Sequence, residues 1–297
     1  VVLLGLLLMQ NHTVQNKLFE RTAKQLLTAE EIFMEDALSV AVCGSRSPLP
    51  GPNRAETCLL IQAGTSKFII DLGRGSGDNL QKWQVDYSDL EAVILSHLHS
   101  DHISDLAEIQ FQTWLGGRKA PLSVLGPKGT ESTVQGFAQA FKLDSIYRSE
   151  HHGAILPIEA YGYDVVEFDG DTNLIFQNED TKITAFKVDH YPVDPSYGFK
   201  IEYKDRSIVI SGDTIALEEM VEYSEGVDVL FHEALAKPLI QRMEKISDEI
   251  GNDVISKVLF DIQDYHATTI EVAEIAKRSE VGLLVFYHLI PAPRNYV

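Results

Sequence analysis

The chain has 297 residues, of which 44% are hydrophobic and 9% aromatic, enough apolar side chains to bury a large core. Its 25 basic and 44 acidic side chains give a formal net charge of −19, which disfavours a partner held mainly through phosphate contacts. No run of basic residues typical of nucleic-acid binding occurs along the sequence. These properties favour an acidic globular protein with one large domain.

The first 36 residues differ in character from the rest. Residues 1–9 are all apolar or glycine, and a polar, helix-compatible stretch follows them. This apolar stretch is too short to cross a bilayer, which takes about 20 residues. It fits either a signal or anchor for export, or an amphipathic helix that docks on the domain or on a second subunit. An export signal predicts a periplasmic or envelope-associated protein, and a cytoplasmic location is the alternative.

Strand-like runs dominate the chain after residue 36. The first set is separated by turn residues and occupies residues 37–43, 58–64, 67–73 and 90–96. A mixed region follows, with a strand and turn at 121–129, a helix at 131–142, and a loop with strands at 151–176. The second set lies at 181–190, 198–214, 227–235 and 282–288, with helices near 238–260 and 268–278. Two sets of strands with helices between and outside them predict two sheets packed face to face and covered by helices.

Only two cysteines occur, Cys43 and Cys58, and they flank a loop rich in proline and glycine between two strand-like runs. On a hairpin the two side chains could meet as a disulfide, which would indicate an oxidising compartment. The alternative is a pair of small buried hydrophobic side chains, which free cysteines usually are. The sequence leaves the two alternatives equal.

A cluster of histidines and aspartates, S-H-L-H-S-D-H at residues 96–102, follows the apolar run 90–95. His97 and His99 are two apart, so they face the same way on an extended segment, and Asp101 continues that side before His102. Imidazole and carboxylate are the usual nitrogen and oxygen ligands of zinc. A lone histidine is more often a surface or hydrogen-bonded residue, but uncompensated clustering of this kind costs stability. The motif therefore predicts a metal site.

Three further residues of types that bind metals lie where an apolar run stops. His190 ends the run 181–190, Asp213 follows residues 207–211, and His288 ends the run 282–288. Side chains at the ends of adjacent strands converge at one edge of a sheet. Because a site for two ions needs ligands beyond residues 97–102, the pattern predicts a binuclear centre.

The sequence resembles the metallo-β-lactamase-fold hydrolases through residues 97–102, D-L-G at 71–73, G-D-T at 212–214, and the placement of His190 and His288. The resemblance covers nearly all of residues 37–297, which we expect to form one hydrolase domain. It implies an α/β fold, an αββα sandwich of two mixed β-sheets flanked by helices.

Within that superfamily the chain is similar to one branch in particular. This branch holds arylsulfatase-like and phosphodiesterase enzymes together with the tRNA 3′-processing endonucleases (ribonuclease Z). The similarity rests on G-P-K-G at 126–129, H-E-A at 232–234 and the segment 266–276.

The resemblance also implies a ligand set for two Zn²⁺ ions per chain, with Mn²⁺ or Fe²⁺ as alternatives. One ion would be held by His97, His99 and His190. The other would be held by Asp101, His102 and His288, and Asp213 would bridge the two. Flavo-diiron relatives carry H-x-E-x-D where this chain has His99, which argues against redox chemistry.

Hydrolysis is the chemistry expected of such a centre. Two cations that share a solvent molecule lower its pKa, so a bridging hydroxide is available at neutral pH. Asp101 can orient that hydroxide or accept its proton, while the cations neutralise charge on phosphoryl or sulfuryl oxygens. We therefore predict a binuclear zinc hydrolase of small phosphate or sulfate esters. The alternatives are a tRNA 3′-processing endonuclease, a lactamase or lactonase, and a metal-binding scaffold without turnover.

His266 is a candidate catalytic residue. It precedes Thr268 and Glu271, which have capping-box spacing, and so lies near a helix N-terminus that favours anions. By resemblance, His266 contacts the scissile group or protonates the leaving oxygen, and Glu233 holds it. The alternative is a capping or surface histidine. His232, next to Glu233 on the same strand, should point the opposite way and be structural.

Three other residues are predicted to surround the centre. Asp71 follows a strand-like run and is expected to brace the metal-bearing loop rather than bind an ion. Trp114 and Tyr197 are candidates for substrate contact, although a tryptophan is more often a core residue.

The expected substrate is a small anionic ester. The tRNA processors carry Arg and Pro directly after G-D-T, whereas this chain has Ile215 and Ala216, and it has no Gly-rich basic arm. These departures and the net charge predict against nucleic acid as a partner. Membrane association or a homo-oligomer through the N-terminal helix completes the expected interactions.

Overall fold

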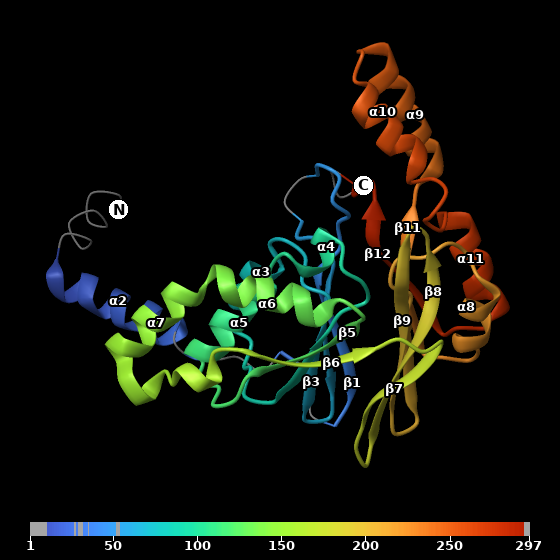
Figure 1. Ribbon diagram of the computed structural model, residues 1–297. Helices are drawn as coiled ribbons and strands as arrows, with labels where there is room; N and C mark the ends of the chain where they lie inside the picture. Colours follow the sequence, from blue (N-terminus) through green and yellow to red (C-terminus); the bar gives the residue numbers. More distant parts are fainter. Residues whose placement is uncertain (1–10, 27, 29–31, 35, 52–53, 294–297) are drawn as a thin grey trace.

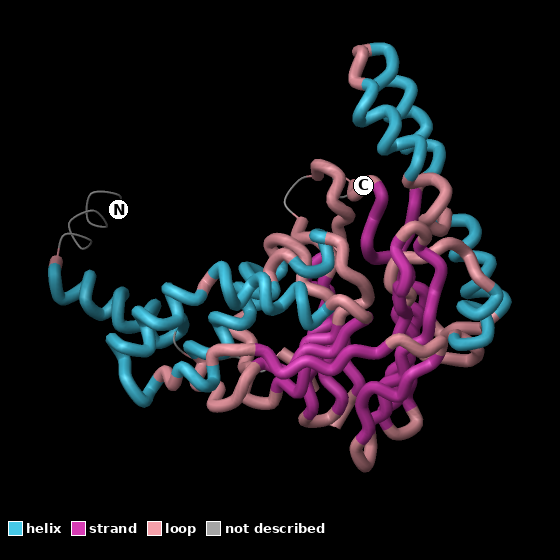
Figure 2. The backbone as a smooth tube through the Cα atoms, viewed as in Figure 1, coloured by secondary structure: helices cyan, strands magenta, loops and turns pink. Residues whose placement is uncertain are grey.

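Two mixed β-sheets packed face to face form the body of the protein (Figures 1 and 2). The structure is a computed structural model that describes residues 11–26, 28, 32–34, 36–51 and 54–293. The first sheet has the order β1-β2-β3-β4-β5-β6 and consists of Leu38–Gly44, Cys58–Ala63, Ser66–Ile70, Leu90–Ile94, Leu122–Pro127 and Tyr163–Phe168. The second has the order β12-β11-β10-β9-β8-β7 and consists, in chain order from β7, of Thr172–Gln177, Thr181–His190, Val193–Tyr203, Arg206–Ile210, Val229–Leu235 and Leu283–Ile290.

Each sheet changes from antiparallel to parallel pairing partway across. In the first sheet β1, β2 and β3 pair antiparallel, and β3 to β6 pair parallel. In the second sheet β7 to β10 pair antiparallel, and β10 to β12 pair parallel. The parallel strands need crossover connections, and these connections supply the helices that cover the outer faces.

The main core lies between the two sheets. Ile61 and Phe68 of the first sheet share one buried cluster with Ile183, Phe199 and Ile210 of the second. Cys58 and Leu60 of β2 and Ile69 of β3 alternate with these residues and belong to a second cluster under the helices. Both faces of these strands are therefore buried, which explains their nearly continuous apolar sequences.

Helices cover both outer faces of the sandwich, as the sequence predicts. On the first sheet lie α3 (Ser76–Lys82), α5 (Leu106–Leu115), α6 (Thr130–Ala140) and α7 (Lys142–His152), and on the second lie α8 (Glu218–Tyr223) and α11 (Thr269–Arg278) (Figure 1). The short helix α4 (Ser100–Ile103) carries part of the histidine cluster. The predicted capping box of α11 is confirmed, because Thr268 and Glu271 exchange hydrogen bonds.

The helical region predicted near residues 238–260 is a hairpin of two helices, α9 (Lys237–Glu249) and α10 (Asp253–Asp261). The turn contains Gly251 at φ +72°, a conformation that glycine adopts readily, and the Asn252 side chain then caps α10. The hairpin projects away from the sandwich (Figure 1). A small apolar cluster that includes Ile240, Leu259 and Ile262 anchors its base on Leu235 and Ile290.

The helix α2 (His12–Leu26) precedes the sandwich in the chain (Figure 1). Its residues 12–24 are exposed apart from the half-buried Val14 and Ala23. The apolar stretch at residues 1–9 lies outside the described residues, and the division of the chain at residue 36 stays a prediction. Within the part of the chain that the structure describes, no helix has both the length and the apolar character needed to cross a membrane.

Cys43 and Cys58 form a disulfide at the base of the loop between β1 and β2, with their Cα atoms 5.0 Å apart. Both side chains are buried. Of the two alternatives that the sequence left open, the structure therefore has the bonded pair.

Replacing both Cys43 and Cys58 with alanine should lower the free energy of unfolding by about 3 kcal/mol, because the bond spans 15 residues and restricts the unfolded chain. Urea denaturation followed by circular dichroism measures the change. Wild-type protein in reductant should fall to the value of the variant. Two titratable thiols in the native protein, with no effect of reductant on its stability, would contradict the assignment.

Candidate metal centre

The predicted metal ligands meet at one edge of the sandwich. The segment after β4 and the start of α4 supply His97, His99, Asp101 and His102, while β8 ends at His190. Asp213 follows β10, and His288 lies in β12. These residues come together because β8, β10 and β12 each end or bend at the same edge of the sandwich. Positive φ at His288, +43°, marks this local departure from strand geometry.

Asp213 is the centre of the cluster. Its Oδ2 lies 3.3 Å from Nε2 of His102, 3.2 Å from Nε2 of His288, and 3.9 Å from Nε2 of both His97 and His190. A single carboxylate oxygen thus faces imidazoles from both predicted ligand groups. This is the placement that a bridging ligand requires.

The other ligand atoms form two compact groups around Asp213. One group is His97, His99 and His190, and the other is Asp101, His102 and His288, with the ligand atoms of each group within 4.8 Å of one another. His97 Nε2 is 3.0 Å from His99 Nδ1, and His288 Nε2 is 3.1 Å from Asp101 Oδ2. These are the two sets that the family resemblance assigns to separate ions.

Three polar atoms of this cluster are buried without a hydrogen-bond partner: Nε2 of His102, Nε2 of His190 and Oδ1 of Asp213. Buried polar atoms are almost always bonded, so three unpaired ones at a single place fit bound cations. Burial lowers the pKa of His190 to about 4 and that of His97 well below its usual range. Both imidazoles are then neutral and have a lone pair to offer a metal.

Asp71 bonds to two residues of the segment that carries the candidate ligands. Its Oδ2 accepts a hydrogen bond of 2.8 Å from His102 Nδ1, and its two oxygens accept from the backbone N–H and the hydroxyl of Ser96. This contact fixes the His102 ring with Nε2 facing Asp213. Residue 71 adopts φ +57°, so the turn that aims this carboxylate is also unusual in its backbone. Asp71 therefore acts on the centre through His102.

His190 is oriented in a comparable way from another part of the chain. Its Nδ1 lies 3.0 Å from the backbone oxygen of Tyr265. The segment that carries His266 thus also positions a metal ligand.

His266 and Glu233 are paired at the rim of the cluster. His266 Nδ1 lies 2.8 Å from Glu233 Oε1, which also accepts a hydrogen bond from the backbone N–H of Thr214. With Nδ1 donating to Glu233, the ring has only Nε2 left for another partner. His232 on the same strand is fully buried, and its Nδ1 donates to the backbone oxygen of Glu233. His232 is accordingly outside the cluster, as expected.

A cavity of about 250 Å³ opens beside these residues. Its polar lining residues are Ser47, His99, Ser100, Asp101, Asp213, His266 and His288. Four of the seven predicted ligands and His266 therefore face one space that a substrate can enter.

Trp114 and Tyr197 do not line this cavity, and their predicted role in substrate contact is corrected to packing. Both are 0% exposed. Trp114 donates to the backbone oxygen of Pro157 and packs against Tyr161, while Tyr197 donates to that of Gly170 within the main core. Their hydroxyl and indole groups are thus satisfied inside the protein.

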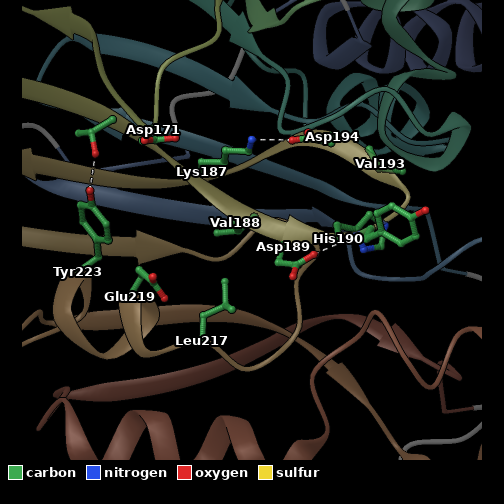
Figure 3. Close-up of a pocket in the computed structure, with 12 residues that line it drawn as sticks. Asp171, Lys187, Val188, Asp189, His190, Val193, Asp194, Leu217, Glu219 and Tyr223 are labelled. Atoms are coloured by element: carbon green, nitrogen blue, oxygen red, sulfur yellow. Dashed lines mark hydrogen bonds and ion pairs between the residues drawn. The ribbon is translucent and has the colours of Figure 1, made fainter.

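A larger groove, of about 610 Å³, is lined mainly by residues of β7, β8, β9 and α8 (Figure 3). Lys187 and Asp194 point toward one another across it and form an ion pair of 2.7 Å. Tyr223 of α8 hydrogen bonds to Thr172. The groove reaches the centre only at His190, so its size does not make it the reactive site.

Sequence reasoning missed the other wall of the small cavity, which comes from the loop after β1 and from the hairpin α9–α10. The one available signal was Tyr265, since it directly precedes His266. The remaining wall residues are ordinary apolar side chains with no motif of their own.

The fold and the two ligand groups together define a metallo-β-lactamase-fold hydrolase. A family model described as "Anti-Pycsar protein Apyc1" matches residues 42–243. Ribonuclease Z of Mycobacterium bovis is 33% identical over 86% of this chain and 87% of its own length, and that of Mycobacterium marinum is 34% identical over the same shares. This chain belongs to the family of metallo-β-lactamase-fold hydrolases that includes Apyc1 and ribonuclease Z.

Solved structures agree on the fold. The metallo-β-lactamase-fold protein YhfI of Bacillus subtilis aligns with a TM-score of 0.62 and 23% identity over 87% of this chain and 89% of its own. The short form of human tRNase Z aligns with a TM-score of 0.63 and 20% identity over 87% and 97%. The predicted sandwich and the predicted superfamily are confirmed.

The prediction against nucleic acid as a partner is wrong. Relatives that match most of the chain are named ribonuclease Z. The prediction relied on the net charge of the whole molecule, but recognition depends on the local field at the binding surface. Two cations at this site would make the local field more positive, and the net charge of the chain does not describe that local field.

Asp71→Asn should weaken Zn²⁺ binding by roughly 10- to 100-fold, because the amide holds His102 less well than the carboxylate does. Titration of chelator-stripped protein by calorimetry measures the affinity directly. Asp205→Asn is the control, since its side chain is 86% exposed and should leave the affinity unchanged. Equal affinities for both variants would show that Asp71 does not support the site.

Proposed function

We propose that the protein is a metal-dependent phosphodiester hydrolase that cleaves RNA in the manner of its ribonuclease Z relatives. The observation that carries the proposal is the position of Asp213 Oδ2, within 3.2–3.9 Å of imidazoles from both ligand groups. Such an arrangement suits two cations and a phosphoryl group. Identity of about a third to ribonuclease Z over most of the chain supports the choice of RNA.

The residues that would hold the ions are His97, His99 and His190 in one group, and Asp101, His102 and His288 in the other, with Asp213 between them. When bound, such ions supply a solvent nucleophile at neutral pH and neutralise charge on the phosphoryl oxygens. We keep zinc as the proposed metal, with manganese and iron as alternatives.

The residues of the chain add proton transfer and orientation. Asp101 Oδ2 lies at the cavity, next to His288, where it can accept a proton or orient the attacking solvent. His266 lines the same cavity, and its Nε2 can donate a proton to the leaving oxygen. Glu233 holds the opposite ring nitrogen, which fixes the tautomer and the ring plane during that transfer.

Small phosphodiesters are the second candidate. The cavity is only about 250 Å³, and the described residues that line it include no lysine or arginine to hold further phosphates. The relatives give no support for sulfate esters, so the proposal is confined to phosphodiester bonds.

We propose a periplasmic or envelope-associated protein, and the Cys43–Cys58 disulfide supports an oxidising compartment. A cytoplasmic location is the alternative.

Zinc-loaded protein should cleave a precursor tRNA that carries a 3′ trailer, and chelator-treated protein should not. Bis(p-nitrophenyl) phosphate is assayed in parallel. Turnover of the small diester alone would select the second candidate. Bound zinc without turnover of either substrate would contradict the proposal and indicate a scaffold.

His266→Ala should reduce the rate by roughly 10²- to 10⁴-fold for a diester with a poor leaving group, because that oxygen needs a proton. The loss should be much smaller for p-nitrophenolate, which leaves without one. Metal content, measured on the same samples, should not change. Equal losses for the two leaving groups would rule out His266 as the general acid.

A further inference from the structure

A buried ion pair lies next to the candidate metal centre. Arg46 and Glu56 are each 5% exposed, and Nη2 of Arg46 lies 2.9 Å from Oε1 of Glu56. Among the described residues, neither of these two belongs to a candidate ligand group or lines the small cavity. Removing two charges from water costs free energy that their attraction often fails to recover. The stability of the fold therefore does not by itself account for this pair.

Arg46 holds the loop that follows β1. Its guanidinium donates to the backbone oxygens of Leu49 at 2.9 Å and of Arg54 at 3.0 Å, in addition to the carboxylate of Glu56. The rigid fork of a guanidinium spans these three acceptors, whereas a lysine ammonium is a compact point charge. Residues 47–49 of this loop line the small cavity. Arg46 thus fixes a loop that borders the centre.

The same loop is bonded to the strand that carries a candidate ligand. The backbone oxygen of Ser45 accepts a hydrogen bond of 2.9 Å from the backbone N–H of Leu289, and Arg46 forms a short parallel bridge with Leu289. Leu289 directly follows His288 in β12, where His288 departs from strand geometry with φ +43°. The loop held by Arg46 therefore fixes the backbone next to His288.

Glu56 is bonded to a second segment of the centre. Its Oε2 accepts a hydrogen bond of 3.2 Å from the backbone N–H of Arg74, and its own backbone N–H donates to the backbone oxygen of Arg74 at 3.0 Å. Gly73 packs against both Glu56 and Asp101. A Cβ atom at residue 73 would lie 2.5 Å from Cβ of Glu56 and 2.1 Å from the backbone oxygen of Asp101.

Residues 71–74 are in turn bonded to His102. Asp71 contacts the His102 ring, and the backbone N–H of Leu72 donates to the backbone oxygen of His102 at 2.7 Å. Glu56 therefore supports the segment that orients His102 and packs on Asp101. Through Arg46 and Glu56 together, the ion pair reaches every member of one ligand group, which we call the Asp101 group: Asp101, His102 and His288.

The other ligand group, which we call the His190 group, consists of His97, His99 and His190. Its His190 ring is oriented by the backbone oxygen of Tyr265. The side chains of the ion pair bond instead to the loop after β1 and to Arg74. A change in the pair should therefore act unequally on the two ions.

We propose that the Arg46–Glu56 pair positions the ligands of the Asp101 group and so sets the affinity of that group for its ion relative to the His190 group. Both are positioning residues, because they act through the backbone of residues 45, 73 and 74. The proposal rests on the metal binding in the proposed function and requires no turnover.

Titration of chelator-stripped protein with Zn²⁺ by calorimetry tests the pair, because it measures the affinity of each ion. Glu56→Gln keeps the shape of the side chain and removes its charge. This variant should weaken one of the two binding steps by about tenfold, the lower end of the effect of residues that orient metal ligands. The other step should keep its wild-type affinity.

Two ligand variants identify the weakened step. His190→Ala removes a ligand of the His190 group, and His288→Ala removes a ligand of the Asp101 group. Adding Glu56→Gln should weaken the ion that remains in His190→Ala protein and should leave the ion that remains in His288→Ala protein unchanged. The reverse pattern would overturn the proposal.

Arg46→Lys tests whether the two residues act as one unit. It keeps the positive charge and loses the fork, so it should weaken the same step as Glu56→Gln. The double variant should then lose no more affinity than the stronger single variant. Losses that add would show two independent effects and contradict the pair.

Ile183→Val is the control for stability. Ile183 is 0% exposed in the main core, near the opposite end of β8 from His190, and the shorter side chain leaves a small cavity there. Both binding steps should keep their wild-type affinity. Equal weakening in Ile183→Val and Glu56→Gln would attribute the effect to stability and overturn the proposal. Circular dichroism verifies folding, and Arg46→Lys carries the test if Glu56→Gln is unfolded.

The outcomes separate the ion pair from the catalytic proposal. Wild-type affinities at both steps in Glu56→Gln and Arg46→Lys would overturn the role of the pair whether or not RNA is cleaved. A step that depends on the pair, in a protein that cleaves neither precursor tRNA nor bis(p-nitrophenyl) phosphate, would support the pair and reject the proposed function. A single zinc-binding step in wild-type protein would also overturn the assignment of the pair to one of two ions.

Discussion

The structure depends on one buried carboxylate, Asp213, surrounded by imidazoles. Burial raises the pKa of Asp213, but His288 and His102 outweigh that effect and hold the pKa well below its usual range. An ionised carboxylate in such a place is costly unless positive charge compensates it. Several polar atoms of the cluster have no hydrogen-bond partner. Bound cations would pair with these atoms and compensate the buried negative charge. The strand ends, the Asp71 turn and the Tyr265 segment all serve to hold rings around this carboxylate.

The surroundings of the centre divide into parts that fix ligands and parts that shape the cavity. Asp71 orients His102, and the backbone of Tyr265 orients His190, so both predicted groups are supported from outside. The described residues of the loop between β1 and β2 and of the hairpin α9–α10 contribute to none of the candidate ligand groups. Because they are connections rather than core strands, they can vary without disturbing the sandwich. These two segments shape the cavity, while the strand ends carry the candidate ligands.

Two lines of sequence reasoning were corrected, for different physical reasons. Net charge describes the field of the whole molecule at long range, whereas a site with bound cations presents its own local field, so −19 did not exclude nucleic acid. Trp114 and Tyr197 stand near the motifs in sequence, but distance along a chain does not say which face of an element a side chain occupies. Both polar groups bond to backbone oxygens inside the protein.

The sequence by itself determined the sandwich, the family and the residues that gather at the centre. Those features are local: apolar runs of strand length, a histidine-rich segment directly after one of them, and single histidines or aspartates where others stop. It also predicted the capping box of α11, which needs only four consecutive residues. Tertiary structure alone decided the rest. The disulfide and the apolar wall from Leu49 and Val258 each join residues distant in the chain. Ordinary apolar residues carry no signal of which cavity they line, because only the packing of the whole chain assigns them a neighbour.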